Sequence, residues 1–176
     1  KLEDTQVAKV AIHTEAGAVA GVKAGIALAE VTGGAARLCR DLVNTPPDAK
    51  RPPVLAKRAA AELKDLGVKV KILDEKALLK GNYGGIMGVG RGSAEPPRLV
   101  ELTWAPKDAT GHVALVGKGV TFDSGGLSLK PAQGMMTMKI DMAGGAAVLA
   151  VMSALKAHKV PVEVTAYIPL TDNMTG

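Results

Sequence analysis

One glycine-rich stretch, residues 117–131, constrains the fold more than any other part of the sequence. It reads Gly-Lys-Gly-Val-Thr-Phe-Asp-Ser-Gly-Gly-Leu-Ser-Leu-Lys-Pro and follows an apolar run over residues 112–116. A helical pattern follows over residues 143–157, so the charged residues fall where a strand ends and a loop begins. Open α/β sheets bind ligands at that edge. The stretch therefore predicts an α/β fold with a ligand site.

Three charged residues in or just after this stretch are candidates for one site. Lys118 and Asp123 stand among glycines and short apolar steps, and Asp141 lies within Met-Lys-Ile-Asp-Met at 138–142. Glycines let the backbone fold tightly enough to bring such groups together. Carboxylates suit hard divalent cations. An aspartate in a glycine-rich loop also commonly forms a turn, and the residues alone leave that alternative open.

Together these blocks resemble the catalytic core of the leucyl aminopeptidase family, whose members are two-metal exopeptidases. The resemblance rests on Gly-Lys-Gly-x-Thr-Phe-Asp-Ser-Gly-Gly at 117–126, Leu-Lys-Pro at 129–131 and Met-Lys-x-Asp-Met at 138–142. Asn-Thr-Pro-Pro at 44–47 and residues 93–104 also resemble the family. Nine fixed residues in a ten-residue block, with two further blocks in order, are far more specific than a lone glycine fingerprint.

The resemblance implies a role for each charged residue. Asp123 would bridge two divalent ions, Mn²⁺ or Zn²⁺, separated by about 3.5–4 Å, and Asp141 would bind one of them. Lys118 would also be a metal ligand, although only a neutral amine can bind a metal. A free lysine has a pKa near 10.4, so burial and two adjacent cations would have to remove its proton. The alternative is a solvated lysine beside a strand end.

Lys130 and Met138 are the residues that the resemblance places beside the substrate. Lys130 would be the catalytic lysine, which stays cationic and stabilises the oxyanion that forms when water attacks the peptide carbonyl. Met138 would line the pocket for the substrate's N-terminal side chain, with a preference for Leu or Met, although methionine is more often core filling. Four other residues are assigned to structure or surface: His13, His112, His158 and Lys139.

The expected fold is a three-layer α/β/α sandwich with a mixed, largely parallel central sheet, incomplete in this chain. Residues 1–41 would be an N-terminal remnant and an interdomain helix, and residues 42–176 the N-terminal part of the catalytic domain. Residues 1–15 are polar, with a short apolar alternation and no clear partner strand. In the family, an Asn-Thr-Asp-Ala-Glu-Gly-Arg block supplies further metal ligands and an arginine that holds bicarbonate. This block is absent from the sequence. This segment alone is therefore expected to bind metal weakly and to be inactive.

Periodicity and helix-stop residues predict the individual elements. The Gly33-Gly34 pair is a possible break in the first helix, and Asp74 is expected to cap a helix. Residues 112–117 are expected to form the central strand. The last strand follows in βαβ order and should be parallel to it. The helices are expected at 16–42, 53–66, 75–80 and 143–157, and the strands at 68–73, 99–104, 112–117 and 162–170.

Composition leaves two other functions to weigh. The net charge of +5 admits nucleic-acid binding, but the sequence has 2% aromatic residues and the basic residues, for example Lys50 and Arg51, are scattered and expected on the surface. A phosphate-binding α/β module is the third hypothesis. It is weakened because the glycine-rich residues 81–92 lack the phosphate-loop register and are better explained by tight backbone packing. Lys118 is also followed by Gly119 and not by a hydroxyl residue.

The remaining expectations concern compartment and partners. A single cysteine, Cys39, excludes an intramolecular disulfide and fits a reducing compartment. No apolar run is expected to approach the roughly 20 residues that cross a bilayer. The sequence thus predicts a cytoplasmic enzyme with peptide substrates and no membrane partner, and the resemblance implies a homo-hexamer.

Overall fold

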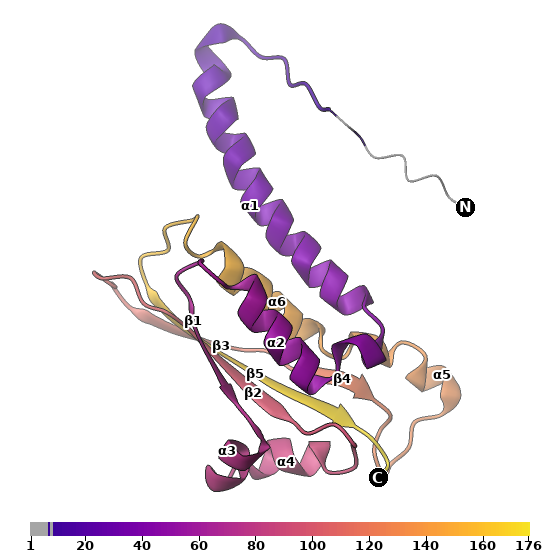
Figure 1. Ribbon diagram of the computed structural model, residues 1–176. Helices are drawn as coiled ribbons and strands as arrows, with labels where there is room; N and C mark the ends of the chain where they lie inside the picture. Colours follow the sequence, from indigo (N-terminus) through magenta and orange to yellow (C-terminus); the bar gives the residue numbers. More distant parts are fainter. Residues whose placement is uncertain (1–6, 8) are drawn as a thin grey trace.

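One mixed sheet organises the chain in the computed structural model, which describes residue 7 and residues 9–176 (Figure 1). The strands run in the order β1-β2-β5-β3, and β4 also pairs with β5. The strands are β1 (Lys69–Leu73), β2 (Arg98–Trp104), β3 (His112–Val116), β4 (Gly119–Asp123) and β5 (Glu163–Asn173). The α-helices are α1 (Val19–Asn44), α2 (Pro52–Glu62), α3 (Glu75–Lys80), α4 (Gly84–Gly90), α5 (Ala132–Met135) and α6 (Ala143–Ala154). Three short 3₁₀ helices complete the described elements: η1 (Ala16–Ala18), η2 (Pro47–Lys50) and η3 (Met138–Ile140).

Strand β5 is the centre of the sheet. It pairs with β2 in the antiparallel sense and with both β3 and β4 in the parallel sense, while β1 pairs antiparallel with β2. The expected mixed sheet and the parallel βαβ unit are therefore confirmed. The expectation that residues 112–117 form the central strand is wrong, because among the described strands β3 contacts only β5 and its residues are mostly exposed. The pairings are also divided evenly between parallel and antiparallel.

Helices lie on both faces of the sheet, as a three-layer sandwich requires. Helices α2 and α6 lie on one face, with the C-terminal end of α1 packed against α6 (Figure 1), over a core that includes Val100 and Ile168, which are direct partners across β2 and β5. Leu99 points to the opposite face, because side chains alternate along a strand. There it packs in a second cluster with Leu78 of α3 and with Ile86 and Met87. The second layer covers only one end of its face.

The helices agree with the sequence expectations in type and differ in extent. Helix α1 runs without a break through Gly33-Gly34, and the helix expected over 53–66 ends as a regular α-helix at Glu62. The Asp74 cap is confirmed, since its Oδ1 accepts a hydrogen bond from the Ala77 N–H at 2.9 Å. The glycine-rich residues 81–92 contain helix α4, which the sequence did not predict.

Two helical segments require a correction to the membrane expectation. Residues 16–44 and residues 132–154 both reach the length and hydropathy of a bilayer span. The second segment includes α6, which packs on β3, β4 and β5, and a third of its most apolar window is buried. In the first segment, residues 16–44, the most apolar window has no buried residue. Helices in the core of a soluble protein also meet these criteria, so the two segments do not themselves establish a membrane span.

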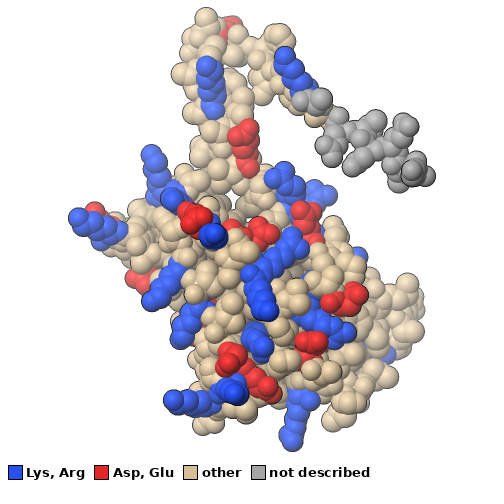
Figure 2. Space-filling view, in the orientation of Figure 1, with Lys and Arg blue, Asp and Glu red and all other residues tan. Residues whose placement is uncertain are grey.

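Lys50 was expected on the surface with the other scattered basic residues, but it lies in the core. The other charges on the face shown in Figure 2 are exposed, with basic and acidic residues interspersed. The Lys50 side chain is 1% exposed, and its Nζ donates to the Leu42 carbonyl at 2.8 Å and the Val43 carbonyl at 3.1 Å. It also lies 3.3 Å from the Met142 Sδ. Lys50 thus ties the end of α1 to the segment that follows η3.

The burial of Lys50 predicts a specific pH dependence of stability. Desolvation and, secondarily, the charge of Lys139 lower the pKa of Lys50 from 10.5 to about 8. Between these values the unfolded state binds more protons than the folded state, so the free energy of unfolding rises with pH. We expect the wild type to gain up to about 3 kcal/mol relative to Lys50→Met between about pH 7 and about pH 10. Urea unfolding at several pH values measures this gain. Parallel stability curves for the two proteins would contradict it.

Candidate metal and active site

Lys118 lies in a two-residue break between β3 and β4. Both strands pair with the same edge of β5, so residues 112–123 form one interrupted strand. The start of α6 packs into the break, where the Gly145 N–H donates to the Lys118 carbonyl at 2.7 Å. A Cβ atom on Gly117 would lie 2.6 Å from the Gly144 carbonyl oxygen, so the close approach requires glycine. The packing against α6 therefore fixes the backbone from which Lys118 extends.

Asp141 is the partner of Lys118. It follows η3, and its Oδ2 lies 2.9 Å from the Lys118 Nζ. The Lys118 side chain is 59% exposed and the Asp141 side chain 20%. The two atoms are close enough for an ion pair, and among the described residues this buried Oδ2 atom has no hydrogen-bond partner. A carboxylate oxygen whose described partner is one mostly exposed ammonium group keeps capacity for a further cation, which fits a metal ligand.

Asp123 and Lys130 form the second ion pair. The Lys130 Nζ donates to the Asp123 Oδ2 at 2.5 Å, and the two side chains are 29% and 15% exposed. The other oxygen, Oδ1, accepts from the Gly125 N–H at 2.9 Å and from the Asn173 Nδ2 at 2.6 Å. Burial alone raises the pKa of Asp123, but the hydrogen bonds from Lys130, Gly125 and Asn173 and the charge of Lys130 together lower it below its usual range. Asp123 is therefore held as an anion.

The structure thus gathers the four charged candidates into two lysine–aspartate pairs, Lys118–Asp141 and Lys130–Asp123. The pairs lie on adjacent elements, since η3, which precedes Asp141, packs against β4. Carboxylates on a glycine-rich frame fit hard divalent cations. The set is incomplete, because no cluster of three or more His, Cys, Asp or Glu occurs in the part of the chain that is described. The burial expected for Lys118 is not found, since more than half of its side chain is exposed.

The other sequence candidates have ordinary surroundings. Met138 opens η3 and is half-buried, three residues before Asp141. Lys139 is also half-buried and donates to the Asn44 carbonyl at 3.3 Å, so it supports the end of α1. His112 contacts the Thr165 hydroxyl and His158 contacts the Thr32 hydroxyl, both outside the site. His13 lies in an apolar hollow beside α1.

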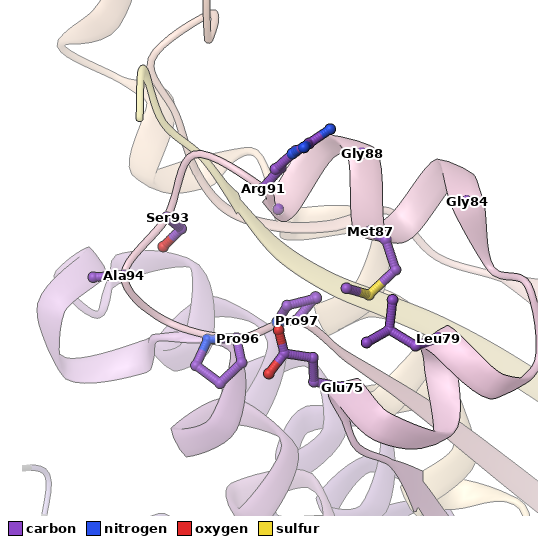
Figure 3. Close-up of a pocket in the computed structure, with 11 residues that line it drawn as sticks. Glu75, Leu79, Gly84, Met87, Gly88, Arg91, Ser93, Ala94, Pro96 and Pro97 are labelled. Atoms are coloured by element: carbon purple, nitrogen blue, oxygen red, sulfur yellow. The ribbon is translucent and has the colours of Figure 1, made fainter.

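A large surface hollow lies away from these pairs. It has a volume of about 760 Å³ and is formed by α3, α4 and the loop over residues 91–97. Figure 3 shows Met87 and Leu79 approaching one another along it, with Glu75 nearby. None of the sequence candidates lines it. We place the candidate site at the lysine–aspartate pairs because charge and coordination capacity, not volume, define a metal site.

Asn173 is a site residue that sequence reasoning missed. It is the last residue of β5 and contacts Asp123 across the parallel pair. The only sequence signal is its position three residues after the strand expected over 162–170, near the strand end where α/β proteins place functional groups. The pairing itself spans 50 residues along the chain and depends on sheet register.

The fold and the two pairs define an α/β protein with a candidate divalent-cation site, and comparisons with known proteins agree. Residues 37–176 match the cytosol aminopeptidase family, catalytic domain. The probable cytosol aminopeptidase of Leifsonia xyli subsp. xyli is 54% identical over 149 residues, covering 85% of this chain and 30% of that protein. The probable cytosol aminopeptidase of Micrococcus luteus is 52% identical over 146 residues, covering 83% and 29%.

Solved structures give the same result. The bottromycin maturation enzyme BotP in complex with Mn is 42% identical with a TM-score of 0.83, covering 99% of this chain and 36% of that chain. The apo leucyl aminopeptidase from Trypanosoma cruzi is 40% identical with a TM-score of 0.79, covering 83% and 29%. This chain belongs to the cytosol aminopeptidase family. It spans about 30% of the length of the curated relatives given above.

The contacts of Asp123 predict how its pKa responds to loss of Lys130. Lys130→Met removes a hydrogen bond and a positive charge while the burial of Asp123 remains, so the pKa of Asp123 should rise. Carboxyl-carbon NMR titration of the metal-free protein measures it. Lys156→Met is the matched control, because Lys156 contacts the Asp65 carbonyl instead. Equal pKa values for Asp123 in all three proteins would show that the Lys130 contact does not form in solution.

Proposed function

We propose that this chain supplies part of the active site of a metal-dependent aminopeptidase, which removes N-terminal residues, preferably leucine or other apolar residues, from peptides. The observation that carries the proposal is the pairing of Lys118 with Asp141 and Lys130 with Asp123, in a chain of this family. Every one of these residues lies in the sequence blocks at 117–131 and 138–142.

Lys118, Asp123 and Asp141 are the residues that would hold two divalent ions. Bound ions of this kind polarise a carbonyl group and lower the pKa of water. Manganese is supported by the Mn complex of BotP, and zinc is the alternative. Two aspartates offset only part of the charge of two divalent ions, so tight binding requires further acidic ligands. We therefore expect the 176-residue chain alone to be inactive, and in the complete enzyme bicarbonate could take part in proton transfer.

Lys130 is the proposed catalytic lysine. Its ammonium group lies against the carboxylate of Asp123, so it would be close to a cation that Asp123 holds. A fixed positive charge there stabilises the oxyanion that develops on the substrate carbonyl. Met138 is proposed to contact the substrate's N-terminal side chain, since it is half-buried at the start of η3, the element that Asp141 directly follows.

Partners and location follow from the same family membership. Peptides are the proposed substrates, and the names of the relatives support a cytosolic protein. The homo-hexamer rests on the family resemblance alone. Nucleic acid is a poor candidate partner, because basic and acidic side chains are interspersed on the face shown in Figure 2.

The first test of this proposal removes a ligand. Asp123→Ala in the complete protein should abolish Mn²⁺-dependent hydrolysis of leucine amide, because a carboxylate proposed to hold the metal is lost. The matched control is Asp108→Ala, since Asp108 is exposed in the turn between β2 and β3. Unaltered turnover by Asp123→Ala would refute the assignment.

The second test separates catalysis from metal binding. Lys130→Met should lower kcat for leucine amide by about 100-fold or more, since it removes oxyanion stabilisation. It should not weaken Mn²⁺ binding, because the lost ammonium group competes with a cation for Asp123. Calorimetry without substrate measures that affinity. Reduced Mn²⁺ affinity with normal kcat would make Lys130 a structural residue.

A further inference from the structure

We propose that Asn173 is a positioning residue for Asp123: its amide holds one carboxylate oxygen so that the other faces the cation position. This inference rests on the proposed metal site for the meaning of that position. Asn173 and Asp123 end β5 and β4, and they are partners in the register of this parallel pair. The contact between the side chains is therefore a property of the sheet and not of a loose loop.

The two oxygens of Asp123 have different partners. Oδ1 accepts two uncharged donors, the Asn173 amide at 2.6 Å and the Gly125 N–H at 2.9 Å. Among the residues that the structure describes, Oδ2 accepts only from the Lys130 ammonium group, at 2.5 Å. A carboxylate can only accept hydrogen bonds, so the Asn173 nitrogen, not its oxygen, must face it. Neutral donors thus fix one oxygen, and the other is left where a positive charge binds.

Asn173 is itself held on several sides. Its backbone carbonyl accepts from the Ser124 N–H at 2.9 Å and from the Ser124 hydroxyl at 2.7 Å. Gly126 has a φ of 68°, and a Cβ there would lie 2.7 Å from the Asn173 Oδ1. Only glycine leaves room for the amide in this orientation.

The preceding residue anchors the end of β5 from the other face. Asp172 is 3% exposed, and it accepts hydrogen bonds from the Thr121 hydroxyl and from the Ser93 hydroxyl, the latter at 3.3 Å. The Arg51 guanidinium lies 3.5 Å from the same carboxylate. Because successive side chains point to opposite faces, this anchor restrains the strand from twisting and carrying Asn173 away from Asp123.

Residues that orient metal ligands commonly contribute about 10- to 100-fold to metal affinity. We expect Asn173→Ala to weaken Mn²⁺ binding by about that factor, measured by calorimetry on the complete protein without substrate. Asn173→Leu keeps a similar side-chain volume but has no donor, and it should lose the same affinity. The thermal unfolding midpoint of the metal-free protein should stay close to that of the control Thr175→Ala, which changes an exposed residue two positions further on.

The outcomes separate this inference from the proposed function. If Asn173→Leu binds Mn²⁺ as the wild type does while Asp123→Ala does not, the amide contact has no positioning role and the metal site stands. If Asp123→Ala also binds Mn²⁺ normally, the metal site itself is refuted. If Asn173→Leu lowers the metal-free unfolding midpoint and leaves Mn²⁺ affinity unchanged, Asn173 is structural only and the inference is wrong.

Discussion

The interrupted strand along one edge of β5 is the constraint on which the rest of the structure depends. Strands β3 and β4 share that edge, and the two residues between them, Gly117 and Lys118, are held by the start of α6. The contact requires bare backbone at Gly117, because a Cβ atom there would lie 2.6 Å from the Gly144 carbonyl oxygen. This junction places Lys118 in the middle of a sheet edge, where its ammonium group lies 2.9 Å from the Asp141 carboxylate.

The same junction sets the electrostatics of the site. Each aspartate of the candidate site is opposed by a lysine, so the metal-free protein carries two ion pairs in place of two uncompensated carboxylates. The pairs are unequal. Lys130–Asp123 is largely enclosed and supported by neutral donors, whereas Lys118 is mostly exposed and its partner oxygen lacks a hydrogen bond.

Much of this arrangement was predictable from sequence, and the exceptions have physical causes. Local patterns gave the helix over 16–42, the Asp74 cap and the strand over 99–104, because period and capping are encoded within a few residues. The residues of the two pairs were found through contiguous motif blocks. The family membership that the motifs indicated is confirmed. The individual roles of these residues remain predictions.

Three features could not be read from local sequence. The central position of β5 depends on pairing with strands up to 72 residues away along the chain, as between Arg98 and Leu170, which hydrophobic pattern does not specify. Helix α4 forms in a segment with many glycines, against their intrinsic propensity, and it packs through Ile86 and Met87 on Leu99. Lys50 was expected in solvent, but the carbonyls at the end of α1 compensate its burial.

The central claim is that Lys118, Asp123 and Asp141 share divalent cations at this sheet edge. The most direct measurement is anomalous diffraction at the manganese edge from crystals of the complete protein grown with Mn²⁺. The account predicts manganese peaks in contact with the carboxylates of Asp123 and Asp141. It also predicts that Lys130 no longer contacts the Asp123 Oδ2, the oxygen that faces the cation. Well-ordered crystals in which both lysine–aspartate pairs persist and manganese is bound elsewhere would contradict it.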